Sequence, residues 1–443
     1  MQLIDQNIKW YQSKFEAFEQ SLNGAKSTSV HAIRRNAMQR FIELGFPTTR
    51  QEEWRFTNIS PISKTEFQPI LRYELNGVTK DDIRPYVLDN ALLLVFINGM
   101  FSPELSDIGS LPAGMLAGSI AEILNKHPEA IQSHINRLMM GEENAFTTLN
   151  TAFLWDGAFI SVPRGVVLEN TIQLLFVATN REQAYAAQPR NLIIAGIDSQ
   201  FKIVETYVGL AKNTYLTNAV TEITLGDNSV VEHDKFQAEG INAYHVGTTR
   251  LQMNAASRYT SNVISLGGSI VRNSITARFD AEGAECILNG LSLGKGTQVV
   301  DNHTVIDHAM PRCSSHELYK SILDGASKGI FNGKVFVRKD AQKTDAKQTN
   351  KTLLLSDDAT MNTKPQLEIF ADDVKCTHGA TIGQLDDEQI FYLRTRGIGL
   401  DAARDILTSA FASDVIDRIT IESLRQQIKR MIQDQLNKNH ISN

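Results

Sequence analysis

The chain contains little cysteine. Its 443 residues include only Cys286, Cys313 and Cys376, an odd number spread over the later part of the sequence. A disulfide framework needs paired cysteines and an oxidising compartment, so this composition excludes a disulfide-stapled secreted domain and indicates a reducing cytosol. The N-terminal stretch also lacks a basic segment followed by an apolar run. We therefore expect no secretory signal and a cytoplasmic protein.

Long apolar runs and an excess of positive charge are missing as well. The most apolar stretch, 91–97, is far shorter than the roughly 20 residues that a membrane-spanning helix needs, so no membrane segment is expected. Lysine and arginine number 44 against 50 aspartate and glutamate residues, for a net charge of −6. Because nucleic-acid binding normally leaves a strongly basic footprint, this balance argues against a nucleic-acid partner.

Familiar catalytic motifs are absent. The run 290–297 resembles a phosphate-binding loop, but only three residues separate Gly290 from Gly294, and Gly296 rather than Ser or Thr follows Lys295. A phosphate loop needs four intervening residues and a hydroxyl directly after the lysine. The sequence also contains no G-x-S-x-G elbow and no H-E-x-x-H helix. We interpret 290–297 as a turn, and any ATP hydrolysis is expected to belong to a partner.

The largest part of the chain is rich in strands. From about Ala158 to Phe370, runs of β-branched and aromatic residues alternate with turns such as Gly226-Asp227 and Gly267-Gly268, and helical periodicity disappears. A sandwich is possible, but roughly 200 residues of uninterrupted strands is large for one sandwich. We favour a β-solenoid, in which each coil buries its inward residues against the next coil. The predicted core spans 151–380.

The N-terminal region, 1–150, is predicted to be α-helical and mixed α/β. Apolar residues at three- and four-residue intervals predict an amphipathic helix over 3–22 and a second helix that ends at Gly45. The buried run 91–97 followed by Asn98-Gly99 predicts a strand that enters a hairpin turn.

The C-terminal region, 381–443, is predicted to be a helical domain. Asp386 is expected to cap its first helix and Gly397 to end it. A last helix begins near Thr420 and is expected to expose one apolar stripe, formed by Leu424, Ile428 and Ile432.

The strongest candidate site is the pair Cys376 and His378. Residues two apart on a strand point to the same face, so the thiol and the imidazole could meet at one ion. These ligands suit zinc, iron or copper better than magnesium or calcium. A closed zinc site usually has four ligands, so the others would come from elsewhere in the chain, from a second subunit or from solvent. Taken alone the spacing is weak evidence, and a small buried cysteine beside an ordinary polar histidine is the commoner explanation of it.

A looser cluster consists of His303, His308, Cys313 and His316. Its spacing matches no standard zinc site. Polar residues at turns are the commoner explanation of such a pattern, and the sequence assigns the cluster no role.

An aromatic and basic group occupies the first C-terminal helix. Aromatic residues beside arginine are enriched where proteins bind one another, although internal packing of the helices explains them equally well. The group comprises Phe391, Tyr392, Arg394 and Arg396.

Several separated motifs together resemble one known family. They are Gly-Phe-Pro-Thr at 45–48, Glu-Trp-Arg-Phe-Thr at 53–57, Lys-Pro-Gln-Leu-Glu at 364–368, Cys-Thr-His-Gly-Ala-Thr at 376–381 and Gln-Ile-Phe-Tyr-Leu-Arg-Thr-Arg-Gly-Ile at 389–398. In this order they resemble the SufB/SufD family of iron–sulfur cluster assembly proteins over nearly the whole chain. The C-x-H form resembles the SufD branch more than the SufB branch.

The resemblance implies a right-handed parallel β-helix core and a non-catalytic scaffold subunit of the SUF system. Such a subunit works with SufB and the ATPase SufC in iron acquisition and cluster formation. It implies a heterodimer with SufB through the solenoid ends, with Cys376 and His378 as candidate ligands of iron or a transient cluster at that interface, and no tightly bound cofactor. It also implies that the helical region around Phe391, Tyr392, Arg394 and Arg396 contacts SufC. An isolated chain is expected to form a homodimer.

A second hypothesis belongs to another class of protein. A β-solenoid enzyme that acts on polysaccharide or transfers an acyl group would share the strand-rich core. Polysaccharide hydrolysis requires two carboxylates at a fixed separation across a groove, and a linear sequence does not exclude such a pair. The missing secretion signal and the missing hexapeptide repeat argue against this alternative.

Overall fold

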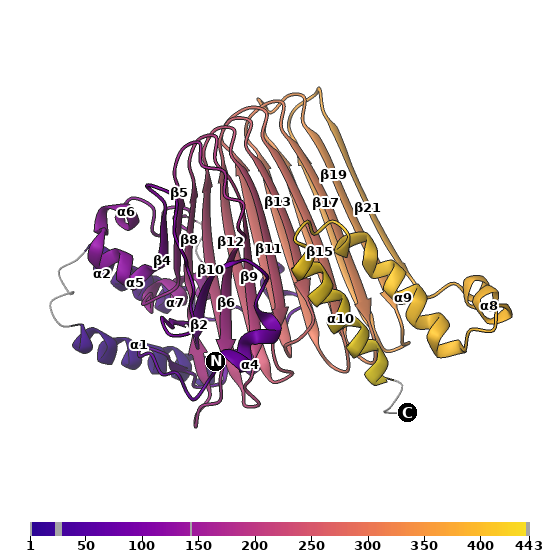
Figure 1. The fold of residues 1–443 in the computed structure, drawn as a ribbon, viewed down its shortest axis with the longest axis horizontal. Helices are drawn as coiled ribbons and strands as arrows, with labels where there is room; N and C mark the ends of the chain where they lie inside the picture. The colour runs from indigo at the N-terminus through magenta and orange to yellow at the C-terminus, as the bar shows by residue number, and fades with distance from the viewer. Residues whose placement is uncertain (1, 23–28, 142–143, 440–443) are drawn as a thin grey trace.

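The computed structural model describes residues 2–22, 29–141 and 144–439. Its body is a β-solenoid of about 8 turns, flanked by helices at both ends of the chain (Figure 1). Each full turn contributes one strand to each of two sheets that enclose a shared core. The predicted solenoid with helical flanks is thereby confirmed.

The strands alternate between the two sheets along the chain. An 11-stranded sheet contains β1 (Gln68–Pro69), β4 (Leu116–Ser119), β5 (Ala158–Val162), β7 (Tyr185–Ala187), β8 (Arg190–Ala195), β10 (Tyr215–Leu225), β12 (Ala243–Met253), β14 (Ile270–Phe279), β16 (Val299–His308), β18 (Lys328–Val337) and β20 (Thr360–Ile369). A 10-stranded sheet contains β2 (Leu92–Ile97), β3 (Met100–Phe101), β6 (Ile172–Ala178), β9 (Gln200–Gly209), β11 (Val230–Ala238), β13 (Arg258–Ser265), β15 (Glu285–Gly294), β17 (Ser314–Leu323), β19 (Asp345–Leu354) and β21 (Lys375–Gly383).

Neighbouring strands of the solenoid are parallel and in register. Every residue from Ser314 to Leu323 in β17, for example, has an aligned partner in β19. Because side chains alternate between the two faces of a strand, aligned inward residues stack in columns through the interior. In β17 the buried and partly exposed positions alternate accordingly at the start of the strand.

The turns between coils use left-handed backbone at stacked positions. Asp198, Asn228 and Ala256 have φ of 60°, 57° and 52° in three successive turns. Asn228 Nδ2 donates to Asp198 Oδ1 at 3.1 Å, which ties one turn to the next. Gly226 approaches the preceding coil so closely that a Cβ there would lie 2.7 Å from the Ile197 nitrogen. The expected Gly226-Asp227 turn is confirmed, and glycine is required at this contact.

Aromatic side chains of the N-terminal region cover the outer face of the first coils of the 11-stranded sheet. They come from α1 (Gln2–Ser21), α2 (Ser29–Leu44), α7 (Ala145–Ala152) and the loops between them. Phe41 and Phe46 meet edge to face with their ring centroids 5.3 Å apart, and Trp54 stacks on Phe146 at 5.4 Å. All of α7 is buried, because it lies between the helices and the first coils.

Arg190 joins the N-terminal helices to the solenoid. Its guanidinium is fully buried and pairs with Glu222, with 2.5 Å between Nη2 and Oε1. Its Nη1 donates to Asn150 Oδ1 at 3.1 Å and to Thr151 Oγ1 at 3.0 Å, both in α7. A buried ion pair is tolerated when hydrogen bonds satisfy its remaining groups, and here they also anchor a helix.

The solenoid sheets begin inside the N-terminal region. β2 forms the predicted hairpin with β3, and Asn98 and Gly99 at its turn have φ of 51° and 84°, as a type I′ turn requires. β2 also pairs in parallel with β6, so it adds an early strand to the 10-stranded sheet. Shorter elements of this region are η2 (Glu52–Trp54), α3 (Ser60–Ser63), α4 (Lys80–Ile83), η3 (Arg84–Tyr86), α5 (Ile120–Lys126) and α6 (Pro128–Gln132).

The C-terminal helices fold back along the outside of the 10-stranded sheet. They are α8 (Asp387–Thr395), α9 (Leu400–Ile416) and α10 (Glu422–Asn439). Asp386 accepts a hydrogen bond from the Glu388 amide, and Gly397 follows α8 with φ of 86°, so the expected cap and stop are confirmed. Figure 1 shows α9 and α10 lying against the strands, while α8 projects beyond β21.

The prediction that the stripe of α10 is exposed is wrong. Leu424, Ile428 and Ile432 are buried in one apolar cluster with residues from the outer face of the sheet, including Leu291 and Ile322. The reason is that both faces of β15 and β17 carry apolar side chains, and the outer face needs a cover. No helix in the described ranges is both long and apolar enough to span a membrane.

Candidate functional site

Cys376 and His378 lie on β21, the last strand of the 10-stranded sheet. They are aligned with Ala346 and Gln348 of β19, which are both buried in the interior. The two candidate ligands therefore share the inward-facing side of the final coil. Cys376 is half-buried and packs against the apolar cluster that contains Ala346, whereas His378 is exposed. No strand of the described chain covers β21 on its other side.

Cys376 and His378 alone are too few ligands for a closed metal site. Cys376 is a free thiol, and its burial raises its pKa, so the thiolate needs a positive partner such as a metal ion to form readily. Across the described ranges, no three His, Cys, Asp or Glu side chains are close enough together to hold a metal ion. A cation at Cys376 and His378 would need ligands from outside these residues.

Two buried polar residues lie beneath the pair in the same inward column. Gln348 is aligned with His378 on one side and with Glu317 on the other. Gln348 Nε2 donates to Glu317 Oε2 at 2.6 Å. Burial raises the pKa of Glu317 to about 7, because a charged carboxylate is poorly solvated inside the coil. The sequence analysis missed both residues. They could have been found only if the number of residues per coil were known, because that number decides which residues are aligned with His378.

The four residues His303, His308, Cys313 and His316 do not come together, and three of them lie on strands rather than at turns. His308 points into the interior, where its Nε2 lies 2.8 Å from Ser315 Oγ, and Cys313 is buried at a turn. His303 and His316 lie on β16 and β17, which belong to different sheets. Alternation along the strands and separation between the sheets explain why four residues close in sequence do not form one site.

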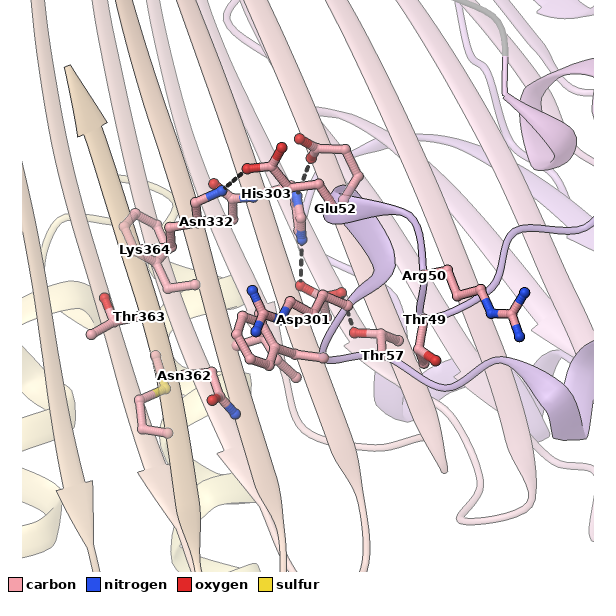
Figure 2. Close-up of a pocket in the computed structure, with 16 residues that line it drawn as sticks. Thr49, Arg50, Glu52, Thr57, Asp301, His303, Asn332, Asn362, Thr363 and Lys364 are labelled. Carbon is pink, nitrogen blue, oxygen red and sulfur yellow. Dashed lines mark hydrogen bonds and ion pairs between the residues drawn. The ribbon is translucent and has the colours of Figure 1, made fainter. Parts of the chain in front are cut away.

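His303 instead helps to line a cavity with a volume of about 670 Å³ (Figure 2). Its Nδ1 lies 3.2 Å from Glu53 Oε2 and its Nε2 lies 2.9 Å from Asp301 Oδ1. Burial alone would lower the pKa of His303, but these two carboxylates hold that pKa above its ordinary value. The ion pairs attach the segment after α2 to the outer face of the 11-stranded sheet.

Trp54 and Thr57 of this segment have packing roles. The Arg272 guanidinium stacks on the Trp54 ring at 3.8 Å and donates to Asp301 Oδ2 at 2.6 Å. Thr57 Oγ1 donates to the same carboxylate oxygen at 2.5 Å. The motif at 53–57 thus holds the N-terminal region against β14 and β16, and it lies far along the chain from Cys376.

The aromatic and basic group of α8 is exposed. Phe391 and Tyr392 show 70% and 57% of their surface to solvent, so they do not pack against the other helices of this chain. Arg396 Nη2 donates to Tyr392 Oη at 3.2 Å, and its guanidinium lies over the Tyr392 ring. Arg394 and Arg396 are exposed as well. This arrangement leaves an apolar surface with positive neighbours beyond the end of the solenoid.

Comparison with known proteins identifies the family. The family model described as SufBD protein N-terminal region matches residues 5–174, and the model described as SUF system FeS cluster assembly, SufBD core domain, matches residues 176–411. The chain belongs to the SufBD family. It is 33% identical over 421 residues to an iron–sulfur cluster assembly SufBD family protein of Synechocystis, covering 93% of this chain and 92% of the relative.

Relatives named SufD extend over similar lengths. The iron–sulfur cluster assembly protein SufD of Escherichia coli is 30% identical over 414 residues, which is 93% of this chain and 94% of the relative. SufD of Bacillus subtilis is 24% identical over 417 residues, or 90% of this chain and 92% of the relative. The resemblance to the SufD branch is therefore confirmed. The chain is an assembly protein of the SUF system rather than the enzyme considered as the alternative.

Proposed function

We propose that this chain is the SufD-type, non-catalytic subunit of a cytoplasmic scaffold that it forms with SufB and the ATPase SufC. In this role it pairs with SufB through the open end of the solenoid and offers Cys376 and His378 to iron or to a nascent cluster at the junction. The observation that carries the proposal is the position of these two residues on an unpaired edge strand. Iron and the cluster are cargo, so they bind transiently.

The free edge of β21 is suited to pairing with another chain. The Lys375 amide donates to the Thr344 carbonyl at 2.8 Å, so alternate residues, including Cys376, His378 and Ala380, direct their backbone groups to the free edge. An unpaired edge of this length is a template for a further strand. β20 is less suited, because Pro365 removes one amide from its free edge.

The ligand types support iron as the cargo. A thiolate and an imidazole bind zinc, iron and copper, and a site with two ligands needs others to be completed. An edge-to-edge partner would bring its own side chains next to Cys376 and His378. Thiolate ligation requires loss of the Cys376 proton, so occupancy should fall at low pH. In the absence of SufB, a second copy of the chain offers the same edge, and a homodimer is expected.

The exposed group on α8 is the proposed contact for SufC. Phe391 and Tyr392 present a large apolar surface, and Arg394 and Arg396 add charge at its border. Large aromatic residues with arginine are typical of the centres of protein interfaces. Since α8 projects away from the solenoid, an ATPase bound there would leave the edge of β21 accessible (Figure 1).

The decisive test replaces the two candidate ligands. Cys376→Ala and His378→Ala should leave folding intact, because one side chain is half-buried and the other is exposed. Both variants should reduce the iron and acid-labile sulfide retained by the anaerobically reconstituted complex with SufB and SufC, and should impair cluster delivery in cells. Thr377→Ala, between them on the same strand, is the matched control. Wild-type iron, sulfide and delivery in both variants would refute the site.

A second experiment tests the ATPase contact. The double variant F391A/Y392A should lower the amount of SufC that co-purifies by about tenfold or more, since hot-spot aromatics contribute on the order of 2 kcal/mol each. Met140→Ala removes a similarly exposed apolar side chain from the N-terminal region and is the control. Equal recovery of SufC with both variants would place the contact elsewhere.

A further inference from the structure

A three-residue column runs through the interior to the open end of the solenoid. Glu317 in β17, Gln348 in β19 and His378 in β21 occupy aligned positions on successive coils. Aligned residues of neighbouring strands are close enough for their side chains to touch. Glu317 and Gln348 are 3% and 1% exposed, whereas His378 terminates the column at the open end. Gln348 is therefore the buried residue aligned with His378 on the neighbouring strand.

The lower end of the column determines how the Gln348 amide is turned. Gln348 Nε2 donates to Glu317 Oε2 at 2.6 Å, so the amino group faces the coil below. Gly333 makes room for it, because a Cβ at that position would lie 2.3 Å from Nε2. Glu317 Oε2 accepts this bond both when the carboxyl group is ionised and when its proton is on Oε1, so it holds the amino group rather than the carbonyl of the amide.

The opposite atom of the same amide is unused. Gln348 Oε1 is buried and has no hydrogen-bond partner among the described residues. A buried acceptor without a partner costs about 1–3 kcal/mol, so such atoms normally serve a purpose. With the amino group committed to Glu317, the oxygen is left for the next coil, where His378 is the aligned residue.

We propose that Gln348 is a positioning residue for His378, whose ring N–H it accepts through Oε1. This inference rests on the proposed role of His378 as a ligand. A hydrogen bond to one ring nitrogen selects the tautomer in which the other nitrogen carries the free lone pair. Ligating histidines commonly have such a partner, which orients the ring and makes the second nitrogen a better ligand. Glu317 acts one step further away by fixing the amide.

The test measures metal binding rather than cluster delivery. The probe is Co²⁺, added anaerobically to the purified complex with SufB and SufC, and the signal is the thiolate-to-cobalt absorption that depends on Cys376. Gln348→Met keeps the length of the side chain and removes the amide. It should weaken Co²⁺ binding by about 10- to 100-fold, the usual effect of losing an outer partner of a histidine ligand.

Two further variants separate positioning from packing. Thr352→Val, on the same strand and also buried, removes a hydroxyl that does not lie beneath His378, and it should bind Co²⁺ as the wild type does. The exchanged pair Q348E/E317Q restores a donor below and an acceptor above. It should recover most of the affinity lost in Gln348→Met, which a purely structural role does not predict.

The outcomes distinguish this inference from the function on which it depends. If the wild-type complex gives no cobalt–thiolate absorption, or if Cys376→Ala leaves it unchanged, the proposed site fails and the inference fails with it. If the wild type binds and folded Gln348→Met binds equally well, only the inference is overturned. If Gln348→Met does not fold, the exchanged pair decides, because weak Co²⁺ binding by that folded variant overturns the inference.

Discussion

The two ends of the solenoid differ in how the edges of their sheets are covered. At the N-terminal end, β3 and β4 form the sheet edges by antiparallel pairing with β2 and β5, and Phe101, Ile108, Leu111 and Met115 pack against the core. At the C-terminal end, β20 is only partly covered and β21 is exposed at nearly every position. The C-terminal helices do not correct this, because they cover the side of the 10-stranded sheet and not its end (Figure 1).

This difference shows that the end of a solenoid is covered only where additional elements of the chain cover it. A coil supplies no cover for its own outer edge, so an uncovered edge exposes backbone donors and acceptors. In the N-terminal region that cover comes from β3, β4 and the loop residues that pack against the core, while the helices lie on the outer face of the 11-stranded sheet. The C-terminal helices likewise cover the outer face of a sheet, and no described strand pairs with the outer edge of β21. The open end is the edge that the proposed function assigns to a partner.

The largest expected effect separates buried from exposed aromatic residues at the two ends. Phe146→Ala should lower the free energy of unfolding by about 3–5 kcal/mol, because it leaves a cavity in a packed core. Phe391→Ala should change it by less than about 0.5 kcal/mol, as expected of a surface residue. Phe146 is fully buried and Phe391 is 70% exposed. Urea unfolding of the two variants measures both losses, and equal losses would contradict the distinction between the packed N-terminal helices and the exposed helix α8.

An intermediate effect compares two buried carboxyl groups. Burial alone would raise the pKa of Glu205, but His233 and Lys235 lower it to about 2, whereas burial raises the pKa of Glu317 to about 7. A raised pKa means that Glu317 contributes stability below about pH 4.5, and that this contribution is lost as the pH rises through 7. Between pH 5 and pH 8 the wild type should lose about 2–3 kcal/mol more than Glu317→Gln.

Unfolding titrations of the two proteins at both pH values measure that difference. Glu205 should contribute nothing over the same interval, because its lowered pKa makes its contribution constant above pH 5 and removes it only as the pH falls toward 2. Parallel pH dependence in the wild type and Glu317→Gln would show that Glu317 is solvated, and the interior would then be wetter near the open end.

The smallest expected effect concerns the edge itself. Ala380→Pro removes one amide from the free side of β21 while leaving its bonds to β19 unchanged. Self-association of the isolated chain should weaken by about tenfold, equivalent to about 1.4 kcal/mol, with little change in unfolding. Ala380→Val retains the amide and is the control. Sedimentation that shows equal association of both variants would mean that β21 is not the strand that pairs.

Local patterns were sufficient to predict most elements. Strands separated by Gly and Asp turns, the hairpin at Asn98-Gly99 and the cap at Asp386 depend on residues a few positions apart, and all are present. Which strands stack on one another was harder to predict from the sequence, because the number of residues per coil varies. Tyr244 is aligned with Ile270, whereas Lys328 is aligned with Thr360, so no fixed period appears in the sequence.

The sequence by itself determined that the chain is a strand-rich solenoid with helices at both ends, and that Cys376 and His378 share one face. These properties follow from alternation along a strand and from turn chemistry, which act over short distances. Only the tertiary structure decided that this face looks inward at an uncovered end, that Gln348 and Glu317 lie beneath it, and that Glu53 meets His303 across 250 positions. Such contacts depend on coil length and on where the helices pack, which are set by the folded chain as a whole.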